Sequence, residues 1–405
     1  MSAPPTKINP WLARLILLAL SLALSLGLAE VAVRLLWPTP RYAYINVANE
    51  KVGYLMQPGY SGRASNMFGD YDTAIHINKE GFRDSDHPFI KSADRRIAFL
   101  GDSFTFAEQV EEPNSFVRRT ETLFNGSRPP VEIMNFGIGG WDIPQYVQCY
   151  ENFVRPYHPD AVVVAVYVDN DLLNSAFYQL EYGFGRPYFR LKDGRLEDVP
   201  SDPAQLDANY KKYRDRLSLR WYHHSHLYNR QKLVIWNIRQ KFNLADAQKH
   251  NRDLPLDKLW KKAGYRNYRY YAQGINDPVV AEADAVTRLL LQRLQHDVEK
   301  DGARLCIALL PAPENLWPDI WPEHLKSLPG LEKIPMDFDR PFKEVNADLP
   351  ELSKRGDILD LRPALREAAK AGPIFYPVDC HYNGRGQEAV AQALAEWLVP
   401  RVSGR

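Results

Sequence analysis

The stretch RRIAFLGDSFTFAEQV, residues 95–110, contains the pattern that decides the fold. Residues 97–100 are a short apolar run of the kind that forms a buried strand, and the run ends abruptly at Gly101. Asp102 and Ser103 follow, so the Ser103 hydroxyl lies at the tip of the predicted strand. A Gly-Asp-Ser sequence is also a common turn. Whether Ser103 is a nucleophile or a turn residue therefore depends on what the rest of the chain brings to the same place.

Strand-like and helix-like patterns alternate downstream of Ser103. Four more strands are predicted, at residues 131–136, 161–168, 303–311 and 357–361. Helices are predicted at residues 114–124, through Val286, Leu290, Leu294 and Val298, and through Val390, Leu394 and Leu398, the last one ending at Pro400. Strands separated by helices form a parallel sheet with helices on both faces. The sequence therefore predicts a three-layer α/β/α domain with a parallel sheet of about five strands.

An apolar segment precedes this domain. Residues 15–29 carry no charge, and Lys7 and Arg14 come before them, which places that end in the cytoplasm under the positive-inside rule. We predict a cytoplasmic N-terminus at residues 1–10 and a transmembrane signal-anchor helix at residues 11–37. The alternative is a cleavable signal peptide that ends at the small residues near Ala29. In both cases the bulk of the chain lies outside the cytoplasm.

The remaining sequence adds two parts to the α/β domain. The predicted parts are a membrane-proximal segment at residues 38–94, the α/β domain at residues 95–175 and 281–405, and an inserted subdomain at residues 176–280. The insert begins with a predicted hairpin that turns at Asp193 and Gly194. Two predicted helical stretches follow, at residues 219–230 and 232–242.

The insert is basic and aromatic. Between Tyr210 and Tyr271 the chain has sixteen Lys and Arg against four Asp, whereas the whole protein has a net charge of +1. One interpretation is a subdomain that packs its aromatic rings on the sheet edge and leaves its cations solvated. A second is a wall or lid beside Ser103 that stacks on sugar rings, and a third is contact with anionic lipid headgroups. Nucleic-acid binding fits the charge, but the predicted location outside the cytoplasm argues against it.

Residues able to do chemistry follow four of the predicted strands. Ser103 follows the first, Gly140 the second and Asn170 the third, and Asp379 and His381 come after the fifth. Ligands bind beyond the carboxyl ends of the strands in parallel sheets of this kind. Acyl transfer needs a hydroxyl, a base to remove its proton, and a carboxylate to orient the base. It also needs hydrogen-bond donors for the oxyanion, which a backbone N–H and an Asn amide supply.

The same residues carry a family resemblance. The segments GDSFTF, NFGIGGWD, VDND and VDCHYNGRG resemble the four signature blocks of the SGNH (GDSL-type) hydrolase superfamily, in the same order. The resemblance covers roughly residues 95–175 and 285–400. INKEGFRD and the apolar N-terminal segment resemble those of its bacterial membrane-anchored envelope members. The resemblance implies the flavodoxin-like fold of that superfamily. It also implies a single-pass protein of the inner membrane whose catalytic domain lies in the periplasm.

The resemblance also implies a role for each residue. Ser103 is the nucleophile, His381 the general base and Asp379 the residue that orients His381. The oxyanion hole consists of the Ser103 N–H, the Gly140 N–H and the Asn170 side chain. Most of the superfamily places Asp and His three residues apart, whereas this chain has Asp-x-His, a spacing shared by some envelope-polysaccharide acetylation proteins. We expect the pair to lie in an extended segment, where residues two apart project to the same side.

Each of these residues also has a structural interpretation. Asn170 fits a helix N-cap, and Asp379 and His381 fit caps of the C-terminal helix. Cys380, between them, is compatible with a redox switch, although we expect it to face away from the pair. We expect Asp102 and Asp171 to hydrogen-bond to loop backbone.

The sequence indicates no metal, cofactor or disulfide framework. The three cysteines, Cys149, Cys306 and Cys380, are scattered and do not have the spacing of metal ligands. His223, His224 and His226 form a cluster, but their spacing divides them between helix faces, which argues against a metal site. P-loop and HExxH motifs are absent from the sequence.

The function predicted from the sequence is a serine esterase that acts through an acyl-enzyme. Its expected substrate is an O-acetyl ester on a cell-envelope polysaccharide, because the site faces the envelope and the insert is aromatic. The first alternative is an O-acyltransferase that moves the acyl group onto a glycan hydroxyl, since residues at the triad do not distinguish the acceptors. The second is an assembly protein that binds glycan without turnover.

Overall fold

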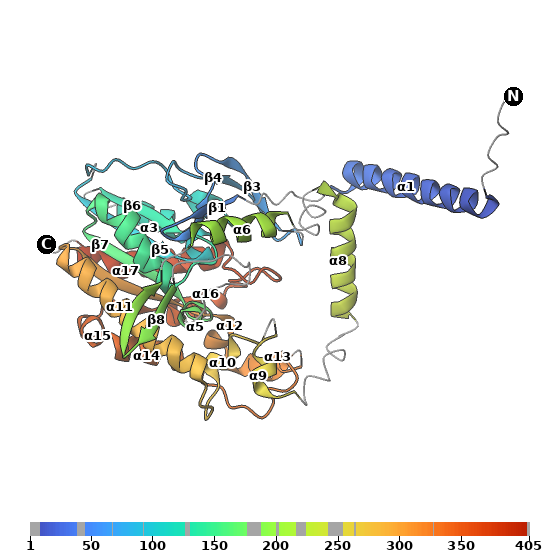
Figure 1. Cartoon of the computed structure of the whole chain (residues 1–405). Helices are drawn as coiled ribbons and strands as arrows, with labels where there is room; N and C mark the ends of the chain where they lie inside the picture. The colour runs from blue at the N-terminus through green and yellow to red at the C-terminus, as the bar shows by residue number, and fades with distance from the viewer. Residues whose placement is uncertain are drawn as a thin grey trace.

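The computed structural model describes residues 9–38, 45–66, 68–91, 93–125, 130–175, 188–199, 202–215, 224–241, 254–262, 265–326 and 328–402. Within them, a central parallel sheet is covered by helices on both faces (Figure 1). The strands of the sheet are β5 (Arg95–Gly101), β6 (Val131–Gly137), β7 (Ala161–Tyr167), β10 (Arg304–Leu310) and β11 (Ile358–Asp360). The predicted fold class is therefore confirmed.

The strand order explains where a site can form. The order across the sheet is β11-β10-β7-β5-β6, and every neighbouring pair is parallel. In chain order this is 5-4-3-1-2, the flavodoxin-like order, whose switch point lies between the first and third strands. Gly101 at the end of β5 pairs with Gly137 on β6 and with Ala165 on β7. The loops that follow these three strands therefore leave the same edge of the sheet.

The alternation of side chains along the strands creates two cores, one on each face. On one face, Ala98 and Leu100 of β5 pack with helices α4 (Ile143–Cys149) and α11 (Pro278–Lys300). On the other face, Ile97 and Phe99 pack with α3 (Phe116–Asn125) and α17 (Gly384–Val402). The predicted helix periodicity is confirmed, since Val286, Leu290, Leu294, Val298, Val390, Leu394 and Leu398 are all buried.

The prediction that Pro400 ends the last helix is wrong. Helix α17 continues through Pro400 to Val402. Pro400 lacks an N–H and so removes one hydrogen bond, but this loss falls in the last turn, where no later turn depends on it. Val402 is buried in the core, which favours continuing the helix.

The segment before β5 packs on the same core as the sheet. It forms two antiparallel pairs, β1 (Asn46–Asn49) with β2 (Gly53–Met56) and β3 (Ser61–Ser65) with β4 (Asp72–His76). Tyr54, Ile75 and Phe82 are buried in the core that contains α4 and α11. This part of the chain therefore contributes to the body of the protein beside the sheet.

The predicted hairpin of the insert is confirmed. Strands β8 (Tyr188–Lys192) and β9 (Arg195–Val199) are antiparallel and turn at Asp193 and Gly194, both with positive φ. The insert continues with α6 (Pro203–Arg214), α8 (His226–Lys241), α9 (Leu256–Leu259) and α10 (Tyr268–Tyr271). Helix α8 falls within the predicted helical stretches, whereas residues 216–223 and 242 lie outside the described residues.

The remaining helices connect the strands or precede the body. They are α1 (Pro10–Leu36), α2 (Ser103–Phe106), α5 (Asp171–Asn174), α12 (Pro313–Leu316), α13 (Trp321–His324), α14 (Arg340–Asp348), α15 (Pro350–Arg355) and α16 (Arg362–Ala369). Helix α1 extends away from the body (Figure 1). It is long and apolar enough to cross a membrane, a property that signal sequences share, and it is the one helix with this property among the described residues.

Candidate active site

The structure brings Ser103, His381 and Asp379 into one line of hydrogen bonds. The Nε2 atom of His381 lies 2.7 Å from the Ser103 Oγ, and the His381 Nδ1 lies 2.6 Å from an Asp379 carboxylate oxygen. When the imidazole proton is on Nδ1, this nitrogen donates to Asp379 and Nε2 accepts from the Ser103 hydroxyl. The side chains of His381 and Asp379 are 23% and 16% exposed, so the line is open to solvent at one side.

Ser103 is presented by a tight turn at the end of β5. It is the first residue of α2, and the Asp102 carboxylate caps this helix by accepting the Phe104 N–H at 2.9 Å. Gly137 on the neighbouring strand allows this close packing, because a Cβ atom there would lie 2.6 Å from the Cβ of Thr105. The serine therefore lies on a short helix that is fixed at its first turn and packed against the sheet.

The residue between the catalytic candidates corrects the expectation of an extended segment. Cys380 has a φ of +65°, which is left-handed backbone that non-glycine residues adopt only at an energetic cost. The Tyr376 N–H donates to the His381 carbonyl at 2.8 Å and closes this loop. Asp379 and His381 thus meet because the chain turns at Cys380, and not because they alternate along a strand.

Residues from outside the loop hold it in place. The Asp379 backbone N–H donates to the Asp70 carboxylate at 2.9 Å, which ties the loop to the segment before β5. The ring of Phe104 lies 4.6 Å from the His381 ring, and the Tyr382 hydroxyl donates to the Pro311 carbonyl at 2.9 Å. Each of these contacts restricts the movement of the imidazole relative to Ser103.

The electrostatics of the site raise the pKa of His381. Burial lowers the pKa of His381, but the hydrogen bond and charge of Asp379, with added charge from Asp102 and Glu108, raise it by more. The net result is a pKa above the ordinary 6.5. Burial also raises the pKa of Asp102, to about 6, and it raises the pKa of Glu108. Positive charge on His381 is therefore stabilised by three nearby carboxyl groups.

The loop after β6 lies against Ser103. A Cβ atom on Gly139 would be 3.7 Å from the Ser103 Cβ, and Gly140 has a φ of +80° that suits glycine. The Tyr54 hydroxyl donates to the Gly139 carbonyl at 2.7 Å. Because the C=O and N–H of a trans peptide point in opposite directions, this bond also sets the direction of the Gly140 N–H.

Asn170 follows β7, the neighbour of β5 on the other side. It occupies the N-cap position of α5, but its side chain makes no capping hydrogen bond. Its Oδ1 is buried and has no hydrogen-bond partner within the described structure. This oxygen is an acceptor, so a donor from water or a ligand would satisfy it.

The structure also shows the surroundings of Asp171 and Cys380, the neighbours of Asn170 and His381 in the sequence. Asp171 accepts the Tyr167 N–H, at the end of β7, at 2.9 Å and the Tyr146 hydroxyl at 2.8 Å, so its backbone partner lies on the strand and not in the loop. Cys380 is exposed as a residue, but partial desolvation of its thiol, with the charges of Asp379 and Glu314, raises the pKa of the thiol. A raised thiol pKa disfavours the thiolate that redox chemistry requires.

The helix-cap interpretation of Asp379 and His381 does not fit the contacts. The residue that caps α17 is Asn383, whose side-chain oxygen accepts the N–H groups of Arg385 and Gly386. The described members of the histidine cluster, His224 and His226, contact α1 through backbone atoms. His223 lies outside the described residues. Within the described residues, no group of three His, Cys, Asp or Glu is placed to hold a metal ion.

A second polar cluster lies beside Asn170. Asn267 donates to the Asp169 carboxylate at 2.7 Å, and Tyr271 donates to its other oxygen at 3.3 Å. Burial, with the nearby charge of Glu314, raises the pKa of Asp169 to about 6. The Tyr268 hydroxyl donates to Glu314 at 2.6 Å. The C-terminal part of the insert thus packs directly behind the loop that carries Asn170.

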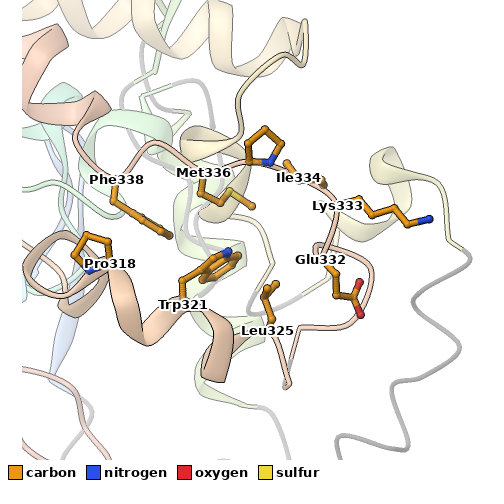
Figure 2. Close-up of a pocket in the computed structure, with 9 residues that line it drawn as sticks. Pro318, Trp321, Leu325, Glu332, Lys333, Ile334, Met336 and Phe338 are labelled. Carbon is orange, nitrogen blue, oxygen red and sulfur yellow. The ribbon is translucent and has the colours of Figure 1, made fainter.

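A pocket lies next to these tyrosines, which contact two of its lining residues. The pocket has a volume of about 460 Å³ and is lined by Pro318, Trp321, Leu325, Glu332, Lys333, Ile334, Pro335, Met336 and Phe338 (Figure 2). The Tyr268 ring lies 4.8 Å from the Trp321 ring, and the Tyr271 ring lies 5.1 Å from the Phe338 ring. The volume is within the range of small-ligand sites, and the walls are mainly apolar and aromatic.

Four aromatic residues of the insert, Trp260, Tyr265, Tyr270 and Tyr271, are buried. Tyr270 packs in a core of the sheet, whereas Trp260 and Tyr265 pack in a separate cluster with Leu328 and Leu331. Trp221 and Tyr222 lie outside the described residues.

Three residues that support the site were not found from the sequence. Arg83 is buried and donates to the carbonyls of Phe106 and Val110, which holds the end of α2. Asp70 holds the Asp379 loop and Tyr54 holds the Gly139 peptide. All three lie before β5. The only signal was the INKEGFRD segment, which contains Arg83 and contributed to the family resemblance.

The C-terminal part of the chain matches a known family. Residues 270–404 match the family described as "SGNH hydrolase-like domain, acetyltransferase AlgX". The matched region contains Asp379 and His381 and does not contain Ser103. The resemblance to the SGNH superfamily is confirmed by this match. None of the curated proteins compared with the chain matches it.

Several solved structures are similar to the chain at low identity. An acetyl-xylooligosaccharide esterase from Geobacillus Stearmophilus has 13% identity and a TM-score of 0.36, with 76% of this chain and 94% of that chain covered. The psychrotrophic esterase EstA from Pseudoalteromonas sp. has 11% identity and a TM-score of 0.36, covering 76% and 98%. A lipase/acylhydrolase from Enterococcus faecalis has 12% identity and a TM-score of 0.34, covering 77% and 98%.

Proposed function

Because the chain is a member of the SGNH hydrolase superfamily, we propose that it is a serine esterase that works through an acyl-enzyme. Ser103 is the nucleophile, His381 the general base, and Asp379 the residue that orients His381. The observation that carries this proposal is the unbroken line of hydrogen bonds from the Ser103 hydroxyl through His381 to the Asp379 carboxylate. This is the arrangement that activates a weak alcohol nucleophile at neutral pH.

The reaction has two steps. The Ser103 Oγ attacks the ester carbonyl while the His381 Nε2 takes its proton, and the imidazolium then gives this proton to the departing alcohol. Water attacks the resulting acyl-enzyme with His381 again as base, and the carboxylic acid leaves as Ser103 is regenerated. Asp379 keeps the imidazole proton on Nδ1 and stabilises the imidazolium, and the raised pKa of His381 is consistent with this role.

The negative oxygen of each tetrahedral intermediate needs hydrogen-bond donors. We assign this role to the Ser103 N–H, the Gly140 N–H and the Asn170 amide. The Tyr54 bond to Gly139 supports the assignment of Gly140, because it fixes the peptide that carries the Gly140 N–H. The position of Asn170 supports its assignment, because it follows β7, the strand that pairs with β5, and its side chain makes no capping hydrogen bond at α5.

The proposed substrate is an O-acetyl ester on a cell-envelope polysaccharide. The matched family is described as an acetyltransferase, which supports an acetyl group. The pocket around Trp321 supports a sugar, because a half-buried aromatic ring with a charged rim at Glu332 and Lys333 suits the apolar face and hydroxyls of a pyranose. Helix α1 anchors the protein in the inner membrane in this proposal, with the body on the periplasmic side.

The second candidate function is O-acyl transfer, which the description of the matched family favours. Hydrolysis and transfer share the acyl-enzyme and differ in whether water or a glycan hydroxyl attacks it. Full-length protein is given p-nitrophenyl acetate with and without a deacetylated glycan. For hydrolysis we expect free acetate equal to the p-nitrophenol released and an unmodified glycan; acetylated glycan formed at the expense of acetate indicates transfer. If p-nitrophenol is released no faster than by a Ser103→Ala variant, neither activity is supported.

The pH dependence of turnover is expected to follow His381. The base must be neutral to accept the proton, and its pKa is raised above 6.5, so kcat/KM should fall as pH decreases through a midpoint above 6.5. Below that midpoint the fall is about tenfold per pH unit for a single essential base. Initial rates from pH 5 to 9, with circular dichroism at each pH to exclude unfolding, measure it. A midpoint below 6.5 in a folded protein would contradict the assigned role of Asp379.

A further inference from the structure

Helix α8 is attached to the C-terminal end of α1 at its first turn. The Glu30 carboxylate of α1 accepts the backbone N–H groups of His226 and Leu227, at 3.0 and 2.9 Å, and the Ser225 hydroxyl at 2.8 Å. A carboxylate in this position satisfies N–H groups that have no partner within a helix and complements the helix dipole. The beginning of α8 is therefore capped by a side chain of α1.

Two arginines strengthen the attachment. Arg34 of α1 donates to the His224 carbonyl at 2.5 Å. Arg230 of α8 donates to the carbonyls of Trp37 and Pro38, at 3.2 and 2.8 Å, and its guanidinium lies 4.2 Å from the Trp37 ring centroid. The contacts thus link α8 to residues 30–38, at the end of the apolar helix.

The depth of these residues in a bilayer follows from the length of α1. Its 27 residues extend about 40 Å at 1.5 Å per residue. The hydrocarbon core of a bilayer is about 30 Å thick, so about 20 residues fill it. If the core begins near Trp11, Glu30 and the residues after it reach the headgroup region. Exposed tryptophans at both ends, Trp11 and Trp37, suit the two interfaces.

Helix α8 runs in a different direction from α1. Figure 1 shows α8 running across the end of α1, not beside it. A helix that crosses the end of a membrane-spanning helix lies in the plane of the bilayer surface.

Helix α8 has the side chains that such a position requires. Val234, Ile235 and Ile238 are 46%, 50% and 46% exposed, and their spacing places them on one face of the helix. Arg230 and Lys232 belong to the same helix, and its sequence contains no acidic residue. An exposed apolar face with cations and no acidic groups is typical of helices that bind anionic membrane surfaces.

We propose that α8 lies in the membrane interface, with Val234, Ile235 and Ile238 at the headgroup and acyl-chain boundary and its cations among anionic lipid headgroups. This inference rests on the part of the proposed function in which α1 is the membrane anchor, and it does not depend on catalysis. Two attachments, one through α1 and one through α8, would hold the body of the protein in one orientation on the bilayer. A fixed orientation presents the catalytic loops at a constant height above the lipids.

The test measures the depth of α8 in a membrane. Full-length protein with Ile235→Cys, in a Cys380→Ser background, is spin-labelled and reconstituted into vesicles of phosphatidylglycerol and phosphatidylcholine in equal amounts. Cys149 and Cys306 are buried, which leaves position 235 as the labelled site. Leu123→Cys in the same background is the matched control, because Leu123 is apolar, 46% exposed and on α3 of the sheet domain. The ratio of label accessibility to oxygen over a water-soluble nickel chelate reports depth.

We expect this ratio to be several-fold higher at position 235 than at position 123, and to decrease in vesicles of phosphatidylcholine alone. An equal, low ratio at both positions in anionic vesicles would overturn the proposal. Dipolar broadening between labels at position 235 that disappears on dilution with unlabelled protein would also overturn it, because the apolar face would then contact a second copy of the chain. Since neither readout involves turnover, an inactive protein with a deep label still supports the membrane position.

Discussion

Replacing Ser103 with alanine is expected to reduce ester turnover by about 10⁶-fold, the scale on which serine hydrolases lose kcat without their nucleophile. The change removes the oxygen that forms the acyl-enzyme and leaves His381 without a group to activate. The fold should be retained, since within the described residues the Ser103 hydroxyl hydrogen-bonds to His381 and, at 3.4 Å, to Asp102, and neither bond joins two secondary-structure elements of the core. The substitution therefore separates loss of chemistry from loss of structure.

Labelling with a fluorophosphonate measures this expectation directly. Wild-type protein should carry one covalent label on Ser103, found by mass spectrometry, and Ser103→Ala should carry none while it keeps the melting temperature of the wild type. Ser353→Ala is the matched control, because Ser353 also has a hydrogen-bonded hydroxyl, to Asn346 at 2.8 Å on another part of the surface, and its loss should leave labelling unchanged. Absence of label on the wild type would favour the non-catalytic alternative, in which the protein binds glycan without turnover.

The sheet and the order of its loops could be predicted because they depend on local patterns. The apolar strands and the four-residue periodicity of Val286 to Val298 are visible within short windows, and buried residues enforce them in the structure. Once the strands are parallel, residues that follow them must lie at one edge. Ser103 and Asn170 are therefore placed at the same edge by topology, even though 67 positions separate them.

The contacts that position the site could not be predicted in this way. Asp70 and Tyr54 belong to a segment of short strands with little periodicity, and its docking against the Asp379 loop and the Gly139 peptide depends on tertiary packing. The left-handed backbone at Cys380 has no sequence signal either, because cysteine has no preference for this conformation. The energetic cost of this conformation is offset by the contacts around it, which is common where a catalytic side chain is positioned.

Asp379→Asn is expected to reduce kcat by about 10⁴-fold, as the corresponding change does in serine proteases. An asparagine can donate an N–H to the His381 Nδ1, which moves the imidazole proton to Nε2. In that tautomer Nε2 cannot accept the Ser103 proton. The substitution also removes the charge that raises the pKa of His381, so the acid limb of the pH profile of the residual activity should move to lower pH.

The matched control is Glu108→Gln, because Glu108 contributes negative charge to His381 without a hydrogen bond to it. If Asp379 acts by fixing the tautomer, Glu108→Gln should shift the pH midpoint slightly downward and leave the plateau rate within about tenfold of the wild type. Equal losses in the two variants would mean that summed charge, and not the hydrogen bond across the left-handed turn at Cys380, makes His381 a base. The Asp-x-His spacing would then have no special role. A loss confined to Asp379→Asn, with melting temperatures unchanged, would mean that the turn at Cys380 orients the Asp379 carboxylate toward His381. In most of the superfamily the longer Asp–His spacing has this role.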